Sequence, residues 1–204
     1  MTGGVPRRLP FLLGLVVLAG CGGAHTAATV NIPAGFAVRS VENPAFSLAL
    51  PKEWRSFGDR SHMSAKEVAG SNQRLRLELE TLAKSDSPIK LVAFDPASGQ
   101  RFHTNMNVLQ TEVPSKLSFD DMAKTEVQQI SRASGIKHIR QQETRVPAGR
   151  ALHLTYRPRP NAVIQQYFVR NGNLLYVLTY STRAADEARF AGVFDQSAHT
   201  FQVG

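Results

Sequence analysis

Cysteine and tryptophan are scarce in this sequence: Cys21 and Trp54 are the single representatives of their types among 204 residues. One cysteine provides neither an internal disulfide framework nor a thiolate-clustered metal site. The chain also lacks a P-loop, a G-x-G-x-x-G fingerprint and a G-x-S-x-G nucleophile elbow. With 42% hydrophobic and 20% charged residues, it is neither a disordered polyelectrolyte nor a multi-span membrane protein. These absences leave one basic globular domain behind an informative N-terminus.

Long hydrophobic runs are scarce too, and the one near the N-terminus is short. Arg7 and Arg8 precede the apolar run Leu9–Leu18, which leads into the small residues Ala19 and Gly20. About ten apolar residues span only ~15 Å as a helix, roughly half the hydrocarbon core of a bilayer. The segment is therefore too short for a stable transmembrane helix, and its pattern is typical of a secretory signal peptide.

Cys21 refines this interpretation, because Leu18-Ala19-Gly20-Cys21 resembles the lipobox of bacterial lipoproteins. The resemblance implies a thioether-linked diacylglycerol on Cys21 and cleavage between Gly20 and Cys21. An ordinary secretory signal with an incidental cysteine is the alternative; a buried cysteine is disfavoured by the surrounding Gly and Ala. Since two acyl chains give a stable anchor, we expect a lipid-anchored protein on the extracytoplasmic side of a bacterial cell membrane.

The basic charge is compatible with such a location. Lys and Arg number 24 against 16 acids, a net charge of +8, and removal of residues 1–20 leaves 22 of those bases against all 16 acids. Anionic lipid headgroups would attract such a domain at short range, although ordinary solubility charge is the favoured explanation. The segment Arg157-Pro158-Arg159-Pro160 is predicted to be a stiff turn. Arg157 and Arg159 there either keep strand ends soluble or contact an anionic surface.

The chain divides into a signal peptide over residues 1–20, a flexible tether over 21–35 and a single domain over 36–204. Residues 22–29 have no apolar periodicity, which favours the tether. Alternation and turn residues predict strands, and Arg74–Leu82 is ambiguous with a preference for helix. The predicted strands are Phe46–Leu50 within an opening segment Val38–Leu50, Ile89–Phe94, Asn105–Val113, Ile136–Arg145, Ala151–Arg157, Ala162–Arg170, Asn173–Tyr180 and Thr200–Val203.

Two helices are expected, over Ser118–Ser134 and from about Thr182 to Ser197. Ser118 is placed to cap the first helix, and Gly135 to end it. The apolar residues expected on the buried faces are Phe119, Met122, Ala123, Val127 and Ile130 in the first helix and Phe190, Val193 and Phe194 in the second.

The strongest hairpin signal is Asn171-Gly172, which favours a type I′ turn. A two-residue loop there places Phe168 opposite Leu175 and makes both faces of the strand pair apolar. Because neither apolar face is stable in water, the pair belongs in the middle of a covered sheet. Together with a second hairpin through Pro147-Ala148-Gly149, this predicts an α+β fold. Its mainly antiparallel β-sheet would have helices packed on both faces, an α/β/α sandwich.

The segment Phe46-Ser47-Leu48-Ala49-Leu50-Pro51-Lys52-Glu53-Trp54 is similar to the F-S-x-x-x-P-x-x-W opening of the PsbP-like superfamily. That superfamily includes the photosystem extrinsic protein, Mog-type Ran-binding factors and LpqN-type actinobacterial lipoproteins. The C-terminal hairpin with Tyr176–Tyr180, the helix after it and Phe201 resemble the family's ending, so the likeness covers about 160 residues. It implies an α/β/α docking module, generally without catalysis, and transfers no binding residues to this chain.

Catalytic and metal-binding patterns are missing from the sequence. None of the six histidines has metal-ligand spacing; His138 and His153 are the pair that a hairpin could bring together, with surface positions as the simpler expectation. The adjacent acids Asp120-Asp121 and Asp186-Glu187 fall at predicted helix starts, where capping explains them better than paired-carboxylate hydrolysis does. We therefore predict no enzyme activity, no cofactor and no metal.

The sequence thus predicts a membrane-anchored, non-catalytic binding or scaffolding module with an envelope protein as partner and no nucleic acid. A carrier for a lipid or small apolar molecule is the alternative, and it needs an apolar-walled pocket of ~300–1,000 Å³. An envelope hydrolase is the third hypothesis, and it needs Ser, His and acidic side chains converging in a cleft.

Overall fold

The computed structural model describes residues 30–43, 45–58, 64–69, 73, 76–77, 79–80, 87–98, 103–134, 136 and 138–204. The predicted signal peptide, Gly20, Cys21 and most of the tether lie outside these residues, as does Gly135. None of the helices described has the combination of length and apolar character that crossing a bilayer requires.

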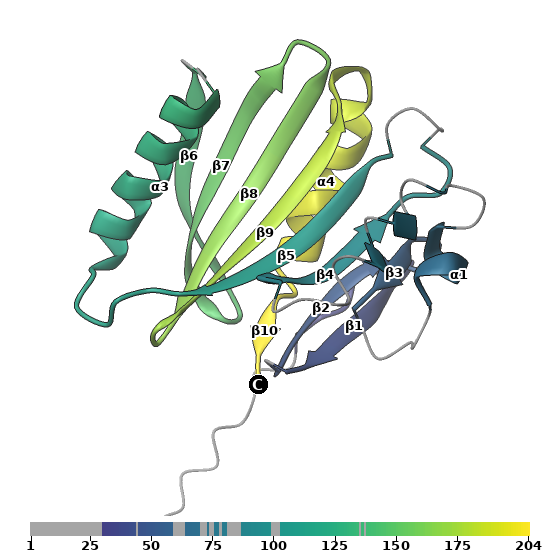
Figure 1. Cartoon of the computed structure of the whole chain (residues 1–204), viewed down its shortest axis with the longest axis horizontal. Helices are drawn as coiled ribbons and strands as arrows, with labels where there is room; N and C mark the ends of the chain where they lie inside the picture. The colour runs from purple at the N-terminus through teal and green to yellow at the C-terminus, as the bar shows by residue number, and fades with distance from the viewer. Residues whose placement is uncertain are drawn as a thin grey trace, which may run out of the picture.

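Two antiparallel sheets form the framework of the domain (Figure 1). The smaller sheet has the order β1-β2-β10, with β1 at Phe36–Glu42, β2 at Ala45–Pro51 and β10 at Gln202–Val203. The larger sheet has the order β3-β4-β5-β9-β8-β7-β6. Its strands are β3 Arg55–Phe57, β4 Ile89–Phe94, β5 Asn105–Glu112, β6 Ile139–Val146, β7 Gly149–Arg159, β8 Ala162–Asn171 and β9 Leu174–Arg183.

The prediction of a mainly antiparallel α+β fold is confirmed, but its division into two sheets was not predicted. The last strand, expected within Thr200–Val203, pairs with β2 rather than with the larger sheet, and Val203 lies opposite Phe46. Phe46 packs against Phe201 and Tyr176, which joins the two sheets through one aromatic contact group. Such long-range pairing of the two ends of a domain leaves no local sequence signal.

The hairpin of β8 and β9 is confirmed, although its predicted turn is wrong. Asn171 lies opposite Leu174, so the turn residues are Gly172 and Asn173, and Phe168 lies opposite Val177 rather than Leu175. Gly172 has a φ of +60°, a conformation that glycine adopts without steric cost. Asn-Gly and Gly-Asn are both turn-forming pairs, so the sequence was compatible with either loop. The observed register of β8 against β9 thus differs from the predicted one by two residues. Because side chains alternate between the faces of a strand, a difference of two residues leaves every side chain on its predicted face.

Alternate residues of this hairpin belong to two separate apolar clusters. Phe168, Leu175 and Val177 pack in one cluster with Met122 of α3 (Phe119–Ser134). The other cluster combines the opposite face of the hairpin with α4 (Glu187–Ala198) and with the single tryptophan. It includes Trp54, Tyr167, Val169, Tyr176, Leu178, Tyr180, Phe190 and Phe194.

The helix α3 matches its prediction. The Ser118 Oγ accepts the backbone N–H of Asp121 at 3.1 Å and donates to the Asp121 carboxylate at 2.6 Å, which caps the helix. All five apolar residues expected on its buried face are in or against the same cluster. The segment predicted over 74–82 is helical at the described positions 76, 77, 79 and 80, and α1 is a short helix over Ala65–Ala69.

The C-terminal helix begins later than predicted. Strand β9 continues to Arg183, a 3₁₀ turn (η1) spans Ala184–Asp186, and α4 starts at Glu187. Thr182 remains in the strand because its hydroxyl is buried and lies 3.0 Å from the hydroxyl of Thr104, the residue directly before β5. This hydrogen bond joins segments that are far apart in the sequence, and a helical periodicity does not report it.

The predicted turn over Arg157–Pro160 is also displaced, because β7 runs to Arg159 and the turn is at Pro160 and Asn161. The β7–β8 register shifts between Tyr156 and Arg159. Pro158 has no N–H to give to a ladder, and the irregularity lets the strand continue past it. At the other end of β7 the hairpin is confirmed, with Pro147 and Ala148 as its turn and Gly149 in the strand.

Candidate functional site

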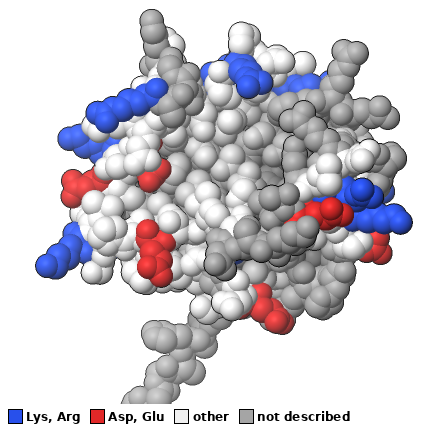
Figure 2. Space-filling model, viewed as in Figure 1, with Lys and Arg blue, Asp and Glu red and all other residues white. Residues whose placement is uncertain are grey.

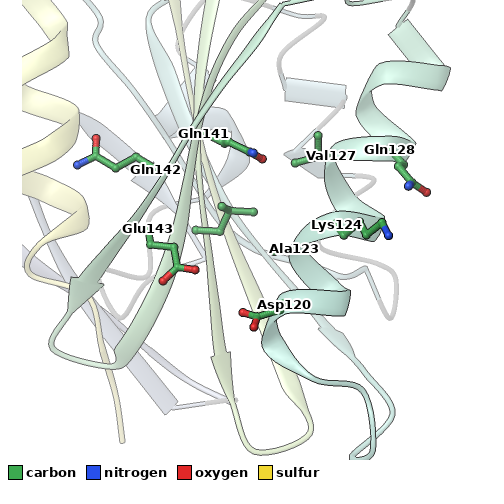
Figure 3. Close-up of a pocket in the computed structure, with 9 residues that line it drawn as sticks. Asp120, Ala123, Lys124, Val127, Gln128, Gln141, Gln142 and Glu143 are labelled. Atoms are coloured by element: carbon green, nitrogen blue, oxygen red, sulfur yellow. The ribbon is translucent and has the colours of Figure 1, made fainter.

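A cleft of about 580 Å³ separates α3 from the end of the larger sheet formed by β6 and β7 (Figure 3). Six of its nine lining residues are polar, and the three apolar ones come from α3 and from β7. The polar residues are Asp120, Lys124, Gln128, Gln141, Gln142 and Glu143, and the apolar ones are Ala123, Val127 and Leu152. The cleft thus combines a small apolar area with hydrogen-bonding and charged walls.

The two walls of the cleft follow from the periodicities of their elements. Ala123 and Val127 are one helical turn apart on α3 and face the sheet, whereas Gln141 and Gln142 point to opposite sides of β6 (Figure 3). β6 is an edge strand of the seven-stranded sheet, and most of its side chains are exposed. The cleft therefore opens beside a sheet edge.

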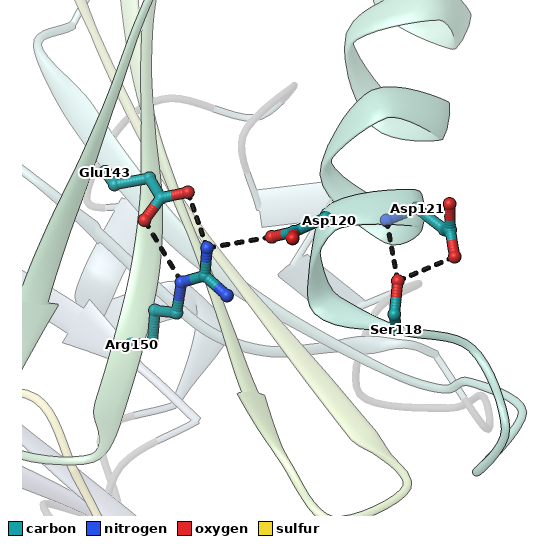
Figure 4. A network of polar contacts seen from close by, with 5 residues as sticks. All are labelled: Ser118, Asp120, Asp121, Glu143 and Arg150. Carbon is teal, nitrogen blue, oxygen red and sulfur yellow. Dashed lines mark hydrogen bonds and ion pairs between the residues drawn. The ribbon is translucent and has the colours of Figure 1, made fainter.

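Arg150 joins the two walls through an ion-pair network (Figure 4). Its Nη2 donates to Glu143 Oε1 at 2.6 Å and to Asp120 Oδ1 at 2.8 Å, and its Nε donates to Glu143 Oε2 at 3.1 Å. The guanidinium also lies 4.4 Å from the centre of the Phe119 ring. These contacts tie the first turn of α3 to the β6–β7 hairpin and set the width of the cleft there.

The same network changes the titration of its members. The hydrogen bond from Arg150 lowers the pKa of Glu143, and the hydrogen bond to Glu143 raises the pKa of Arg150. Farther along α3, burial raises the pKa of Glu126, which shares a helix face with Met122 and Ile130. Glu143 and Arg150 therefore each favour the charged form of the other near the start of α3. For Glu126, in contrast, burial makes loss of the proton less favourable.

The loop before α3 is fixed by Arg170 from the β8–β9 hairpin. Its Nη2 donates to the carbonyls of Pro114 at 3.3 Å and Ser115 at 3.0 Å, and its Nη1 donates to the carbonyl of Leu117. One side chain thus satisfies three carbonyl groups of a short loop. Because this loop leads directly into Ser118, Arg170 helps to position the helix that forms one wall of the cleft.

A second polar group occupies the opposite face of β6–β8, beside the end of α4. The Tyr167 hydroxyl donates to Asp195 Oδ1 at 3.1 Å, and His199 Nδ1 lies 3.3 Å from the same oxygen. The His199 Nε2 is 3.4 Å from the Thr144 hydroxyl. The His153 ring stacks on Tyr167 with 4.2 Å between ring centres, and burial lowers its pKa.

The order Asp195, His199, Thr144 has the connectivity of a catalytic triad, and the sequence did not predict it. His199 Nδ1 is however closer to the Asp195 backbone carbonyl, at 2.8 Å, in the last turn of α4. A histidine that caps terminal carbonyls in this way stabilises a helix end. The arrangement therefore holds α4 against β6, and it lies on the other side of the sheet from the cleft.

The pair of His138 and His153 that a hairpin could have brought together, and that surface positions were expected to replace, is not formed. His153 lies opposite Gln142 on β6 and Tyr167 on β8, whereas His138 precedes β6 and is exposed. The register puts Ile139 opposite Tyr156, three residues beyond His153, so His138 is farther still. Within the described residues, no three His, Cys, Asp or Glu side chains are grouped as metal ligands.

The adjacent acids at the helix starts serve in local contacts. Asp121 completes the cap with Ser118, while Asp120 binds Arg150. Asp186 pairs with Arg183 at 2.6 Å, and Glu187 pairs with Arg157 at 2.5 Å. The two acidic pairs are thus used in capping and ion pairing. Arg159, the other candidate for an anionic contact, is exposed near the β7–β8 turn.

The roles of Arg150, Glu143 and Gln141 were missed in the sequence. In the observed register Glu143 and Arg150 are diagonal neighbours across β6 and β7, close enough for long side chains to meet. The predicted strands ended at Arg145 and began at Ala151, so Arg150 lay outside them, and a two-residue turn at Pro147-Ala148 is the signal that would have placed the two side chains together. The contribution of Asp120 depends on how α3 packs against the sheet, and no local pattern reports it.

Comparisons with known proteins give a fold but no sequence family. No family model and no curated protein matches the chain. The solution structure of cyanobacterial PsbP (CyanoP) from Synechocystis sp. PCC 6803 is similar at 15% identity, with a TM-score of 0.54 over 92% of this chain and 99% of that one. The Ran-binding protein Mog1p of Saccharomyces cerevisiae is similar at 13% identity, with a TM-score of 0.51 over 86% of this chain and 96% of that one. The expected PsbP-like and Mog-type fold is thereby confirmed.

Proposed function

We propose that this chain is a lipoprotein anchored to the cell membrane on the extracytoplasmic side, and that its folded domain is a non-catalytic binding module for an envelope protein. The anchor rests on Leu18-Ala19-Gly20-Cys21, with the diacylglycerol on Cys21. The binding role rests on one structural observation above all: a polar-walled cleft with a small apolar floor opens beside an exposed edge strand. Its fold is shared with a protein described as Ran-binding, which is consistent with a docking role.

In this proposal residues 36–204 act as one α/β/α unit. Support comes from the two apolar clusters, because α3 contributes to one and α4 to the other across the β8–β9 hairpin. Such a rigid sheet holds the cleft in a fixed shape, and preorganised sites bind with a smaller entropic cost.

We also assign Arg159, with Arg157, to contact with anionic headgroups. The Arg157 charge is partly balanced by Glu187, whereas Arg159 is exposed close to the β7–β8 turn. On the face shown in Figure 2, basic and acidic side chains are interspersed over the described surface. The electrostatic contribution of these arginines is therefore secondary to that of the lipid anchor.

A carrier for a small apolar molecule is the second candidate, because a volume of about 580 Å³ suits a small ligand. The six polar lining residues argue against a lipid tail as its occupant. Solvent extraction of the purified protein followed by mass spectrometry separates the two candidates: a stoichiometric lipid other than the covalent anchor favours the carrier.

The anchor is tested by replacing Cys21. We expect the wild-type protein to lose residues 1–20, to gain the mass of a diacylglycerol and to partition into detergent. Cys21→Ala should retain its leader and carry no acyl group, while Ala28→Ser, a change outside the lipobox, should behave as the wild type. Intact-mass measurement and detergent partitioning give the readout. A wild-type protein with its leader attached and no acyl adduct rules out the anchor.

A further inference from the structure

We propose that the free edge of β6 accepts an extended, acidic segment of a partner protein as an additional strand, and that alternate side chains of this segment enter the cleft beside α3. This inference rests on the proposed function as a binding module, and it names both the surface and the chemistry of its partner. Recognition by strand addition combines main-chain hydrogen bonds, which supply affinity, with side-chain pockets, which supply specificity.

The first support is the position of β6 in the sheet. It is the last strand in the order β3-β4-β5-β9-β8-β7-β6, and β7 is the only described strand that pairs with it. Five of its eight residues are exposed. An edge strand of this length presents a row of backbone donors and acceptors to an incoming chain.

The register determines which backbone groups face outward. Val146 and Gly149 flank the two-residue turn Pro147-Ala148, and such a turn is closed by a hydrogen-bonded pair. Hydrogen-bonded pairs then recur at every second residue, so Arg140, Gln142 and Thr144 bond toward β7. The backbone N–H and C=O groups at the alternate positions 139, 141, 143 and 145 consequently point away from the sheet.

The same alternate residues face the cleft. The side chains of Gln141 and Glu143 line it opposite α3, and that of Gln141 points toward Val127 (Figure 3). Side chains of an added strand would lie about 5 Å from those of β6 on the same face. Every second residue of the added segment would therefore reach the mouth of the cleft, between β6 and the exposed Lys124 and Gln128 of α3.

The charges of the β6 residues indicate which kind of segment would bind to this edge. Arg140 and Arg145 are exposed near the two ends of β6, and no ion pair is found for either within the described part of the chain. Glu143, the single acid on the strand, is already held by Arg150. An acidic segment complements this edge, whereas a second copy of the chain would bring two more arginines to it.

Binding of a short designed peptide to the full chain in detergent solution tests this inference. The probe is the peptide DTVTVTVD-NH2 with fluorescein on its N-terminal amine, and KTVTVTVK-NH2 labelled on the same amine is its charge-reversed control. Fluorescence anisotropy should show at least about tenfold tighter binding of the acidic peptide, weakening with salt. Equal binding of the two peptides, or no binding of the acidic one, overturns the proposal.

A pair of variants separates backbone recognition from side-chain recognition. Gln141→Pro removes an outward N–H without touching the β6–β7 ladder, whereas Gln141→Ala keeps that N–H. We expect Gln141→Pro to weaken binding about tenfold or more and Gln141→Ala to weaken it far less. Trp54 fluorescence checks that both variants are folded, and equal affinities of Gln141→Pro and the wild type contradict strand addition.

Should Gln141→Pro fail to fold, N-methylated peptides provide the same information with the wild-type protein. Only every second amide of the added strand would point toward β6. N-methylation of the amides that face β6 should therefore abolish binding, and N-methylation of the amides that face away from β6 should preserve it. Equal binding of both methylated peptides overturns the inference. If the protein is lipidated but does not bind the acidic peptide, the strand-addition site is ruled out and the anchor is retained. If the protein binds the peptide but carries no lipid, the anchor is ruled out and the strand-addition site is retained.

Discussion

The guanidinium of Arg150 binds the carboxylate of Glu143 with two nitrogen atoms, Nη2 at 2.6 Å and Nε at 3.1 Å. The two residues come from neighbouring strands, and Arg150 also reaches Asp120 on α3. This bidentate contact therefore orients an arginine that joins a sheet edge to a helix. Together with the apolar packing of α3 and the contacts of Arg170, this side chain holds the two walls of the cleft in place.

Replacing Arg150 with lysine tests that role. Arg150→Lys keeps the positive charge but loses the planar fork that bonds Glu143 and Asp120 together. We expect the first turn of α3 to open more often, with amide hydrogen exchange over 119–123 faster by about threefold or more. Arg145→Lys is the matched control, because Arg145 lies directly opposite Arg150 on the neighbouring strand. Equal exchange rates in the two variants would contradict the role of Arg150.

A second prediction concerns His153 and stability at acid pH. Burial is the main cause that lowers the pKa of His153 below its ordinary value of 6.5, and nearby His199 and Arg140 act in the same direction. Asp195 and a hydrogen bond with Gln165 oppose the shift. As the pH falls through about 6.5, the unfolded chain takes up a proton more readily than the folded one, so the free energy of unfolding decreases.

The test compares Tm at pH 7.5 and pH 5.0 for the wild type and two variants. His153→Gln should show a smaller loss of Tm on acidification, since it removes the group that must stay neutral when folded. His138→Gln, at an exposed position before β6, should behave like the wild type. The prediction concerns the change between the two pH values, because loss of the stack on Tyr167 lowers Tm at both. An unchanged pH dependence in His153→Gln would be inconsistent with it.

A third prediction compares two glycines with positive φ. A Cβ at Gly58 would lie 2.3 Å from the Lys90 carbonyl oxygen on β4, whereas a Cβ at Gly172 would have nothing within 4 Å. Gly172→Ala should cost about 1 kcal/mol, from backbone strain alone. Gly58→Ala should cost about 3 kcal/mol or more, because strain and a backbone clash combine. Urea unfolding followed by Trp54 fluorescence measures both, and similar costs would show that β3 and β4 are not held this closely.

Much of the fold follows from short-range patterns in the sequence. The 3.6-residue spacing from Phe119 to Ile130 predicts α3 and its buried face, and the alternation around residue 172 predicts a hairpin with two apolar faces. Both patterns succeed because they depend on local geometry and on the cost of exposing apolar surface. The exact turn was missed because Asn171-Gly172 and Gly172-Asn173 are both good turns, and the choice between them depends on cross-strand packing.

The site was less accessible to such reasoning. Gln141 and Glu143 are ordinary polar residues in a strand, and their importance arises from the edge position of β6, which only the strand order reveals. The contact between Asp195 and His199 follows a helical spacing of four, but its link to Thr144 crosses from α4 to β6. Sequence patterns report neighbours within an element, whereas these groups meet through packing between elements.

The linear sequence alone is the source of the proposed membrane anchor, because the resemblance to a lipobox is a property of one continuous segment. It also predicted α3 and the β8–β9 hairpin, because both follow local periodicity. Tertiary packing decided which strand became an edge, which arginine joined the sheet to α3 and where a cleft remained. The physical reason is that edges and clefts depend on the order in which distant segments pair, and that order depends on the apolar area buried over the whole domain rather than on any single segment.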